Sequence, residues 1–196
     1  MTRWDEIAAG FDHVRLSSFC NGRIKIGYPP AVGQVDINLT GSVLLSDRHI
    51  IGQAEFDNCG MRSFALPGIS PDLIHEVPGG RHLLCEGWLI DLSDGTEIAK
   101  QPVSYVRGMI SGNDRLFSYW THEIACYDAS GLSWFQRGLF GGNMHSVELE
   151  EDVLVCSGHF DWDHNHYRLD LSSETGEVIG GDAFAVKQHE GIEAPR

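Results

Sequence analysis

Short apolar runs alternate with turn-forming residues through most of the chain, and they follow a repeated order. One phrase is a polar turn followed by an apolar run, and its copies begin 33, 34 and 38 residues apart at Asp47, Gly80, Asp114 and Asp152. A second phrase is an apolar run that ends in aspartate before a glycine turn, and its aspartates lie 34, 37 and 42 residues apart at Asp57, Asp91, Asp128 and Asp170. Two phrases that keep register over four copies predict a repeated structural unit.

Each phrase is typical of a half-buried β-strand that is stopped by a turn. Glycine adopts positive φ without steric cost, and aspartate or serine can bond to the backbone just ahead. We therefore expect four antiparallel hairpins, each made of the two phrases of one copy and ending near Gly60, Gly95, Gly131 and Gly176. Helical patterns are weak, with a turn or two over residues 4–14 and 70–77. With 23 glycines and 7 prolines between short runs, the chain is predicted to be all-β.

Two stretches resemble the blades of quinoprotein-like and WD40-like β-propellers. They are residues 123–134 and 167–179, in which a strand of the type ALDLxTG turns into a strand ending in tryptophan or an apolar residue. The resemblance covers residues 107–181 well and residues 42–106 loosely. It implies about four antiparallel blade-like repeats in a small β-propeller, and it implies no cofactor. The alternative is that the same hairpins stack as an irregular β-sandwich.

The length of 196 residues suits a single domain over residues 1–196. Within it we expect an atypical N-terminal segment at 1–41, four β repeats at 42–181 and a C-terminal tail at 182–196. Asp36 and Gly41 imitate the second phrase, but Asp36 lies only 21 residues before Asp57, which is too short for four strands.

The charge of the chain argues against nucleic acid as a partner. The formal net charge is -14, and residues 148–196 alone hold 12 acidic residues against 3 basic ones. A phosphate backbone is held mainly by lysine and arginine, so we expect no nucleic-acid binding. No run of apolar residues is long enough for a membrane span, and the first ten residues lack the apolar stretch of a secretory signal. We therefore expect a cytoplasmic protein without membrane contact.

The five cysteines are predicted to be small buried residues without disulfides. They show no Cys-x-x-Cys pair, and they are Cys20, Cys59, Cys85, Cys126 and Cys156. This spacing fits neither a zinc knuckle nor a disulfide framework. Cys85 and Cys156 occupy equivalent places in the repeat, so both are expected to be buried.

The densest group of potential ligands lies between His159 and His166. If a metal were bound there, His164, His166 and Asp161 would be the ligands, because residues two apart on a strand share a face. The repeat places this segment in a loop, and loops collect aspartate, asparagine and histidine. We therefore expect a loop that contacts a partner, with no metal and no cofactor. The letters of His164-Asn165-His166 spell HNH, but HNH nucleases also need a helix beside their metal site. The sequence predicts no helix here, so we do not expect a nuclease.

No nucleophile elbow, P-loop or dinucleotide fingerprint is present. We therefore expect a non-catalytic acidic binding protein, similar in general character to bacterial toxin-immunity proteins, that engages a basic protein partner. The alternatives are a metal-dependent hydrolase that uses the cluster from His159 to His166, and a small β-propeller lectin or ligand-binding module. The expected partner-binding residues combine tryptophan anchors with carboxylates and imidazoles, and they are Trp162, Asp161, Asp163, His164, His166 and Trp120.

Overall fold

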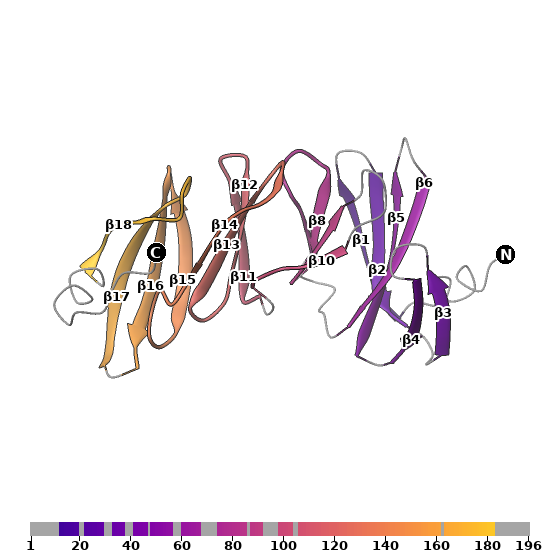
Figure 1. Ribbon diagram of the computed structural model, residues 1–196, viewed down its shortest axis with the longest axis horizontal. Coiled ribbons are helices and arrows are strands. Elements are labelled where there is room, and N and C mark those ends of the chain that lie inside the picture. Colours follow the sequence, from indigo (N-terminus) through magenta and orange to yellow (C-terminus); the bar gives the residue numbers. More distant parts are fainter. Residues whose placement is uncertain are drawn as a thin grey trace. The chain divides into compact units, whose positions relative to one another are not determined.

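The computed structural model describes residues 12–19, 22–29, 33–37, 41–46, 48–56, 60–67, 74–85, 87–91, 98–103, 106–161 and 163–182. Within these residues the regular elements are strands, which form four four-stranded sheets and one two-stranded sheet, all antiparallel (Figure 1). The all-β prediction is confirmed. The chain divides into two compact units, Met1–Gln101 and Pro102–Arg196. The expectation of a single domain stays a prediction.

The first sheet of the first unit joins strands from well-separated parts of the chain. Its order is β1-β2-β5-β6, with bounds β1 Asp12–Phe19, β2 Gly22–Tyr28, β5 His49–Phe56 and β6 Gly60–Pro67. Between β2 and β5 the chain forms a separate hairpin of β3 Gly33–Ile37 and β4 Gly41–Leu45. The segment 1–41 thus supplies β1 and β2 to the sheet. Both phrases of the first copy fall along the single long strand β5, whereas in later copies they lie on successive strands.

The second sheet of this unit is a short meander in chain order. Its strands are β7 Ile74–Glu76, β8 His82–Cys85, β9 Trp88–Asp91 and β10 Ile98–Lys100. Residues 74–76 are therefore a strand, and the helical turn predicted over 70–77 is wrong there. Residues 12–14 likewise belong to β1, while the rest of both predicted helical turns, 4–11 and 70–73, lies outside the described residues.

The core of the first unit lies between these two sheets, and a smaller cluster lies under the β3–β4 hairpin. The main cluster includes Ile26, Ile50, Phe64, Leu83 and Ile90, all at most 2% exposed. The second cluster joins Ile37, Leu45, Ile51 and Ala65. The first sheet is therefore covered on both faces at Ile50 and Ile51, two consecutive residues of β5 that are both fully buried.

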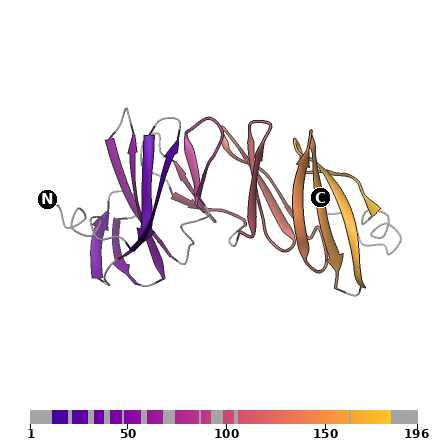
Figure 2. The ribbon, with the colours of Figure 1, turned by 180° about the vertical axis from the view of Figure 1, so that it is seen from behind.

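The second unit consists of two meanders, each with strands in chain order (Figures 1 and 2). The first has β11 Gly108–Gly112, β12 Arg115–Tyr119, β13 Glu123–Asp128 and β14 Gly131–Arg137. The second has β15 Met144–Glu150, β16 Val153–Phe160, β17 Asp163–Ser172 and β18 Val178–Gly180. In the three later copies the two phrases form the hairpins β8–β9, β12–β13 and β16–β17, as the sequence predicts. The hairpin predicted for the first copy is wrong, because both of its phrases lie along β5.

The turn aspartates of the repeat do not share one role. Asp128 accepts hydrogen bonds from the Ser130 amide at 2.8 Å and the Ser130 hydroxyl at 2.6 Å, which hold the pKa of this carboxyl below its usual value. Asp91 and Asp170 instead accept hydrogen bonds from arginine side chains, those of Arg81 and Arg168, both at 2.7 Å. Asp57 lies outside the described residues.

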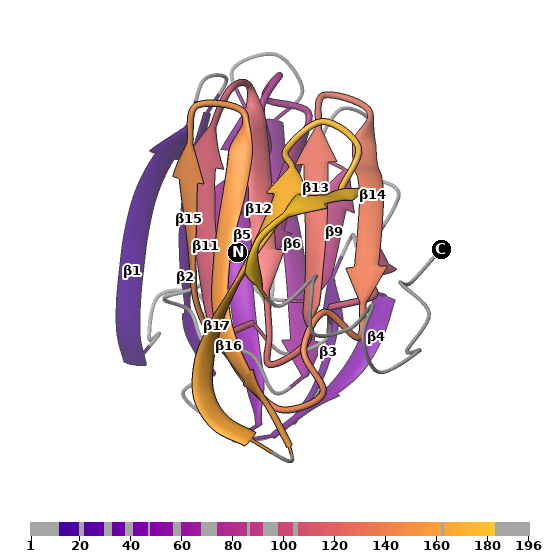
Figure 3. The ribbon, with the colours of Figure 1, turned by 90° about the vertical axis from the view of Figure 1, so that its left-hand side faces the viewer.

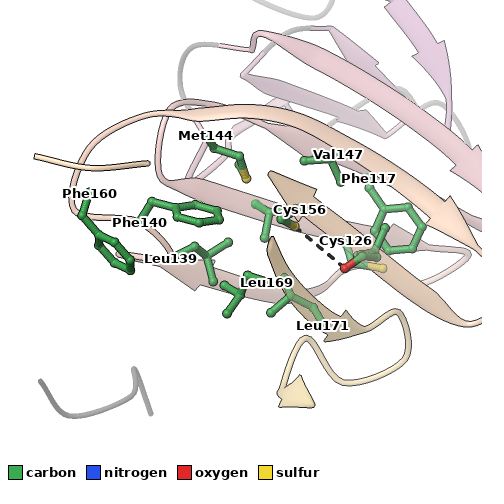
Figure 4. Close-up of a cluster of buried hydrophobic side chains, with 12 residues drawn as sticks. Phe117, Cys126, Leu139, Phe140, Met144, Val147, Cys156, Phe160, Leu169 and Leu171 are labelled. Atoms are coloured by element: carbon green, nitrogen blue, oxygen red, sulfur yellow. Dashed lines mark hydrogen bonds between the residues drawn. The ribbon is translucent and has the colours of Figure 1, made fainter. Parts of the chain in front are cut away.

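The core of the second unit lies between its two sheets (Figure 4). Along β16, buried and half-buried residues alternate strictly, so that Leu154, Cys156 and Phe160 point into this core. Burial raises the pKa of both Cys126 and Cys156 to about 12. Cys85, Cys126 and Cys156 are buried, which confirms the placement of Cys85 and Cys156, while Cys20 and Cys59 lie outside the described residues.

The carbonyl oxygen of Ser173 links the two sheets of the second unit. Ser173 follows β17 and is 2% exposed, and its carbonyl accepts hydrogen bonds from Arg115 Nη1 at 2.7 Å and Trp134 Nε1 at 3.1 Å. The indole of Trp134 also lies against Gly176, whose φ is 74° and where any Cβ would meet the ring. Glycine is therefore required at position 176 for two reasons, its backbone conformation and the close approach of the ring.

We predict that Trp134→Phe lowers the free energy of unfolding by about 1 kcal/mol, the typical net value of one hydrogen bond. Phenylalanine keeps a ring against Gly176 but cannot donate to Ser173. Urea unfolding followed by circular dichroism measures the change. The control is Leu132→Ala on the same strand, where Leu132 is 41% exposed, and it should change stability by less than about 0.5 kcal/mol. An equal decrease in the free energy of unfolding of both variants would contradict a stabilising role for the hydrogen bond from Trp134 to Ser173.

In the first unit, Gly52→Ala should be destabilising by about 1–3 kcal/mol, the usual cost of overpacking. Gly52 pairs with Phe64 across β5 and β6, and an added Cβ would overlap the Phe64 ring, which is fully buried. The neighbouring variant Gln53→Ala, with its side chain on the other face of the sheet, is the control. If Gly52→Ala has the same melting temperature as the wild-type chain, the Phe64 ring does not fill the space beside Gly52.

Candidate functional site

The segment from His159 to His166 is a tight hairpin, which corrects the prediction of a loop there. Strand β16 continues to Phe160, and β17 begins at Asp163, with Phe160 and Asp163 paired. The physical reason is that Phe160 is 1% exposed and belongs to the core, so burial extends the strand past the point at which polar residues begin.

The structure places four of the expected partner-binding residues on this hairpin. Asp161 is exposed in the turn, and His166 is exposed on β17. Asp163 and His164 are residues of β17, whose side chains are not described at these two positions, and Trp162 lies outside the described residues. Trp120 is half-buried in the turn that follows β12, where its amide donates to the Glu123 carbonyl at 2.9 Å.

Three histidines from three adjacent strands meet at one end of the last sheet. His145 on β15 has its Nε2 atom 2.8 Å from Nδ1 of His159 on β16, and their ring centres are 4.8 Å apart. The ring of His166 on β17 lies 5.0 Å from that of His145. His145 and His159 are half-buried, whereas His166 is exposed. We call these three residues the histidine cluster.

Backbone contacts hold the histidine cluster in place. The loop before β15 pairs with His159, because the Gly142 amide donates to the His159 carbonyl at 3.1 Å and the His159 amide donates to Asn143 at 3.0 Å. Gly142 lies so close to the imidazole of His159 that a Cβ there would be 2.8 Å from its Cδ2 atom. Arg107 Nη1 donates to the carbonyl of Met144 at 2.9 Å, beside His145.

The surroundings of His145 favour its neutral imidazole. Burial lowers the pKa of His145 below its ordinary value of 6.5, and the nearby His159, His166 and Arg107 lower it further. A neutral imidazole has one N–H donor and one acceptor nitrogen, so the 2.8 Å contact is a hydrogen bond only when one of the two facing nitrogens carries no proton.

His145 is the member of the cluster that the sequence pattern did not single out. It lies 14 residues before His159, outside the dense segment from His159 to His166. Its proximity depends on the register of β15 against β16, which includes a bulge between Met144 and Ser146. The sequence pattern predicts no strand at His145 and places His159 and His166 in a loop, so it held no signal that would have joined the three residues. Among the described side chains, no group of three or more His, Cys, Asp or Glu residues could hold a metal ion.

A second feature of the last sheet is a groove of about 400 Å³ on its side away from the core, a side that faces the viewer in Figure 3. It is lined by Glu150, Glu151, Val153, Arg168, Asp170 and Ile179. Arg168 is held within it, with Nε 2.7 Å from Asp170 and Nη2 3.7 Å from Glu150. The groove is thus lined by three carboxylates and one guanidinium, beside an isoleucine that is 57% exposed.

Comparisons with known proteins do not assign this chain to a family. No family model matches it, and no curated protein matches it. Among solved structures, it is similar to the AfRom2 CNH domain, with a TM-score of 0.40 and 10% sequence identity over 87% of this chain. The match covers 54% of that chain, so this chain spans about half the length of that structure. In the described part of the chain, no helix is long and apolar enough to cross a membrane.

We predict that the free energy of unfolding of the metal-free protein decreases as the pH falls below 6.5, the ordinary pKa of histidine. Because the pKa of His145 is lowered by folding, the unfolded chain binds a proton that the folded chain excludes, so acid favours unfolding. Urea titrations between pH 7.5 and pH 5.5 in EDTA measure the slope. A His145→Gln variant should show a smaller slope, and an unchanged slope would show that His145 does not contribute.

Proposed function

We propose that this protein is a non-catalytic binding protein whose acidic C-terminal sheet engages a basic protein partner, in the manner of bacterial toxin-immunity proteins. The observation that carries the proposal is the groove on the last sheet, where Glu150, Glu151 and Asp170 outnumber Arg168. Opposite charge across an interface speeds encounter and selects partners. A cytoplasmic location is part of the proposal.

We propose further that the four-stranded sheets are blade-like repeats of a propeller-like scaffold. Three of them are antiparallel meanders with strands in chain order, which is the arrangement within a propeller blade. The first sheet has the same strand number, with the β3–β4 hairpin inserted between its second and third strands. Such scaffolds present the turns and edges of their sheets to partners.

The chemistry of the groove suits a lysine or arginine side chain from a partner. Val153 and Ile179 provide apolar surface for the aliphatic part of such a side chain, and the carboxylates of Glu150 and Glu151 are exposed for its charged end. Arg168 already pairs with Asp170 and Glu150, which leaves Glu151 as the carboxylate with no arginine contact of its own in the groove.

The hairpin turn is the second proposed contact. Asp161 is exposed at the tip between β16 and β17, the same two strands whose other ends carry Val153 and Asp170. Trp162 and Asp163 follow it in the sequence, so an aromatic residue stands between two carboxylates. Tryptophan is favoured in the centres of protein interfaces, and carboxylates beside it would meet arginine or lysine.

The described cysteines support binding rather than thiol catalysis. A nucleophilic cysteine needs a lowered pKa and access to substrate. Cys126 and Cys156 have the opposite properties, because both are buried in the core and burial raises the pKa of each to about 12.

The partner can be sought by capture from the source cell on the immobilised chain and by co-expression with the product of the neighbouring reading frame. Rescue of cells from a toxic neighbouring product would support an immunity role. The affinity of the purified partner should fall as salt rises, because salt screens exposed charges. An affinity that does not change with salt concentration would contradict the proposal that acidic residues bind the partner.

We predict that Trp162→Ala, or Asp161→Asn combined with Asp163→Asn, weakens partner binding by at least about 2 kcal/mol, a typical loss at an interface hot spot. Glu150→Gln combined with Glu151→Gln should also weaken it. The matched control is Glu174→Gln combined with Glu177→Gln, two exposed carboxylates outside the groove, which changes net charge equally. Equal effects of the two double glutamine variants would indicate attraction by net charge alone and would overturn the groove as a contact.

A further inference from the structure

We propose that the histidine cluster, together with Arg107, binds a phosphate group. Arg107 directly precedes β11 and lies against the start of β15, where its Nη1 atom donates to the Met144 carbonyl at 2.9 Å. Guanidinium and imidazole N–H groups are side-chain donors suited to phosphate oxygens. The site lies at the opposite end of β15 and β16 from the groove, so the proposal does not depend on the protein partner.

Among the described residues, the side chains of this site form no ion pair with a carboxylate. They are His145, His159, His166 and Arg107. Three other arginines of the chain each pair with a carboxylate oxygen that is 2.7 to 2.9 Å away. Arg107 is exposed, and it keeps guanidinium N–H groups that donate to no described residue. In a chain with a net charge of -14, a cationic site without a carboxylate favours an external anion.

The contact between His145 and His159 orients a donor even when the cluster is neutral. Nε2 of His145 and Nδ1 of His159 are 2.8 Å apart, so one of these nitrogens donates and the other accepts. When His159 donates, the single proton of neutral His145 lies on its Nδ1 atom, which has no hydrogen-bond partner among the described residues. His145 then offers this N–H group to a phosphate oxygen without first gaining a proton.

Binding of an anion at this site is coupled to protonation of its histidines. Burial lowers the pKa of His145, and His159 on β16, His166 on β17 and Arg107 before β11 lower it further. A bound dianion offsets the repulsion among these groups when they carry positive charge. Because a protonated imidazole binds an oxyanion more strongly than a neutral one, the affinity should rise as the pH falls from 7.5 to 6.0.

The test uses the full ¹⁵N-labelled chain in NMR titrations at pH 6.0 and pH 7.5, with ionic strength held constant. Inorganic phosphate and O-phosphoserine are titrated separately, and the tighter ligand shows whether the site prefers a free ion or a phosphorylated side chain. Sulfate keeps its charge over this pH range, so its tighter binding at pH 6.0 would report the histidines alone. A sulfate affinity that does not change with pH would overturn their role. Acetate carries less charge and fewer oxygens, and an affinity equal to that of phosphate would overturn the assignment of the ligand.

Arg107→Gln and His166→Gln should each weaken phosphate binding at pH 6.0 by about tenfold or more, since a hydrogen bond to a charged group contributes about that factor. Both side chains are exposed, so both variants should keep the fold, which circular dichroism checks. The matched control is Arg137→Gln, which removes an exposed arginine of the same unit and changes the net charge as Arg107→Gln does. Phosphate affinity should not change by more than about twofold in this control.

Absence of phosphate binding by the wild-type chain at pH 6.0 would overturn the proposal. Equal losses of affinity in Arg107→Gln and Arg137→Gln would also overturn it, because the anion would then respond to net charge alone.

Discussion

A four-stranded sheet with one apolar face needs a second layer to cover that face, and this constraint organises both units. In the second unit the cover is another meander, and the core between the sheets draws on β12, β13, β15, β16 and β17. Apolar contact alone would leave the two layers free to slide. Arg115 and Trp134 restrict this by donating to one buried carbonyl of the opposite sheet, at Ser173. Because that carbonyl is buried, the loss of these donors would leave it without compensation for its lost hydration.

The strand content was predictable because its signals are local. An aspartate or serine close before glycine favours a turn through local contacts, and Asp128 with Ser130 and Gly131 illustrates the mechanism directly. Other features depend on contacts between distant residues. Asp91 and Asp170 have the sequence context of turn residues, but Arg81 and Arg168 bind them within the sheets. Likewise, both phrases of the first copy merged into β5, because two layers cover that strand.

The candidate site was predicted only in part. The sequence singled out the segment from His159 to His166 for its polar side chains, but the loop conformation predicted for it was wrong. Burial of Phe160 extends β16, and the sequence context of a polar segment does not reveal that burial. His145 was missed for a different reason. Its contact with His159 depends on the register and bulge of β15, which are set by packing across the whole sheet.

The insertion of the β3–β4 hairpin affects how the chain folds. Pairing of β2 with β5 joins residues as distant as Gly22 and Phe56, whereas β11 to β14 and β15 to β18 pair across short turns. Closing a longer loop costs more entropy before its contacts form, and folding slows as the average sequence separation of contacts rises. The two meanders of the second unit are therefore expected to gain their strand pairing earlier in refolding than the first sheet. A nascent chain would reverse this advantage, since ribosomal synthesis delivers β1 and β2 long before β15.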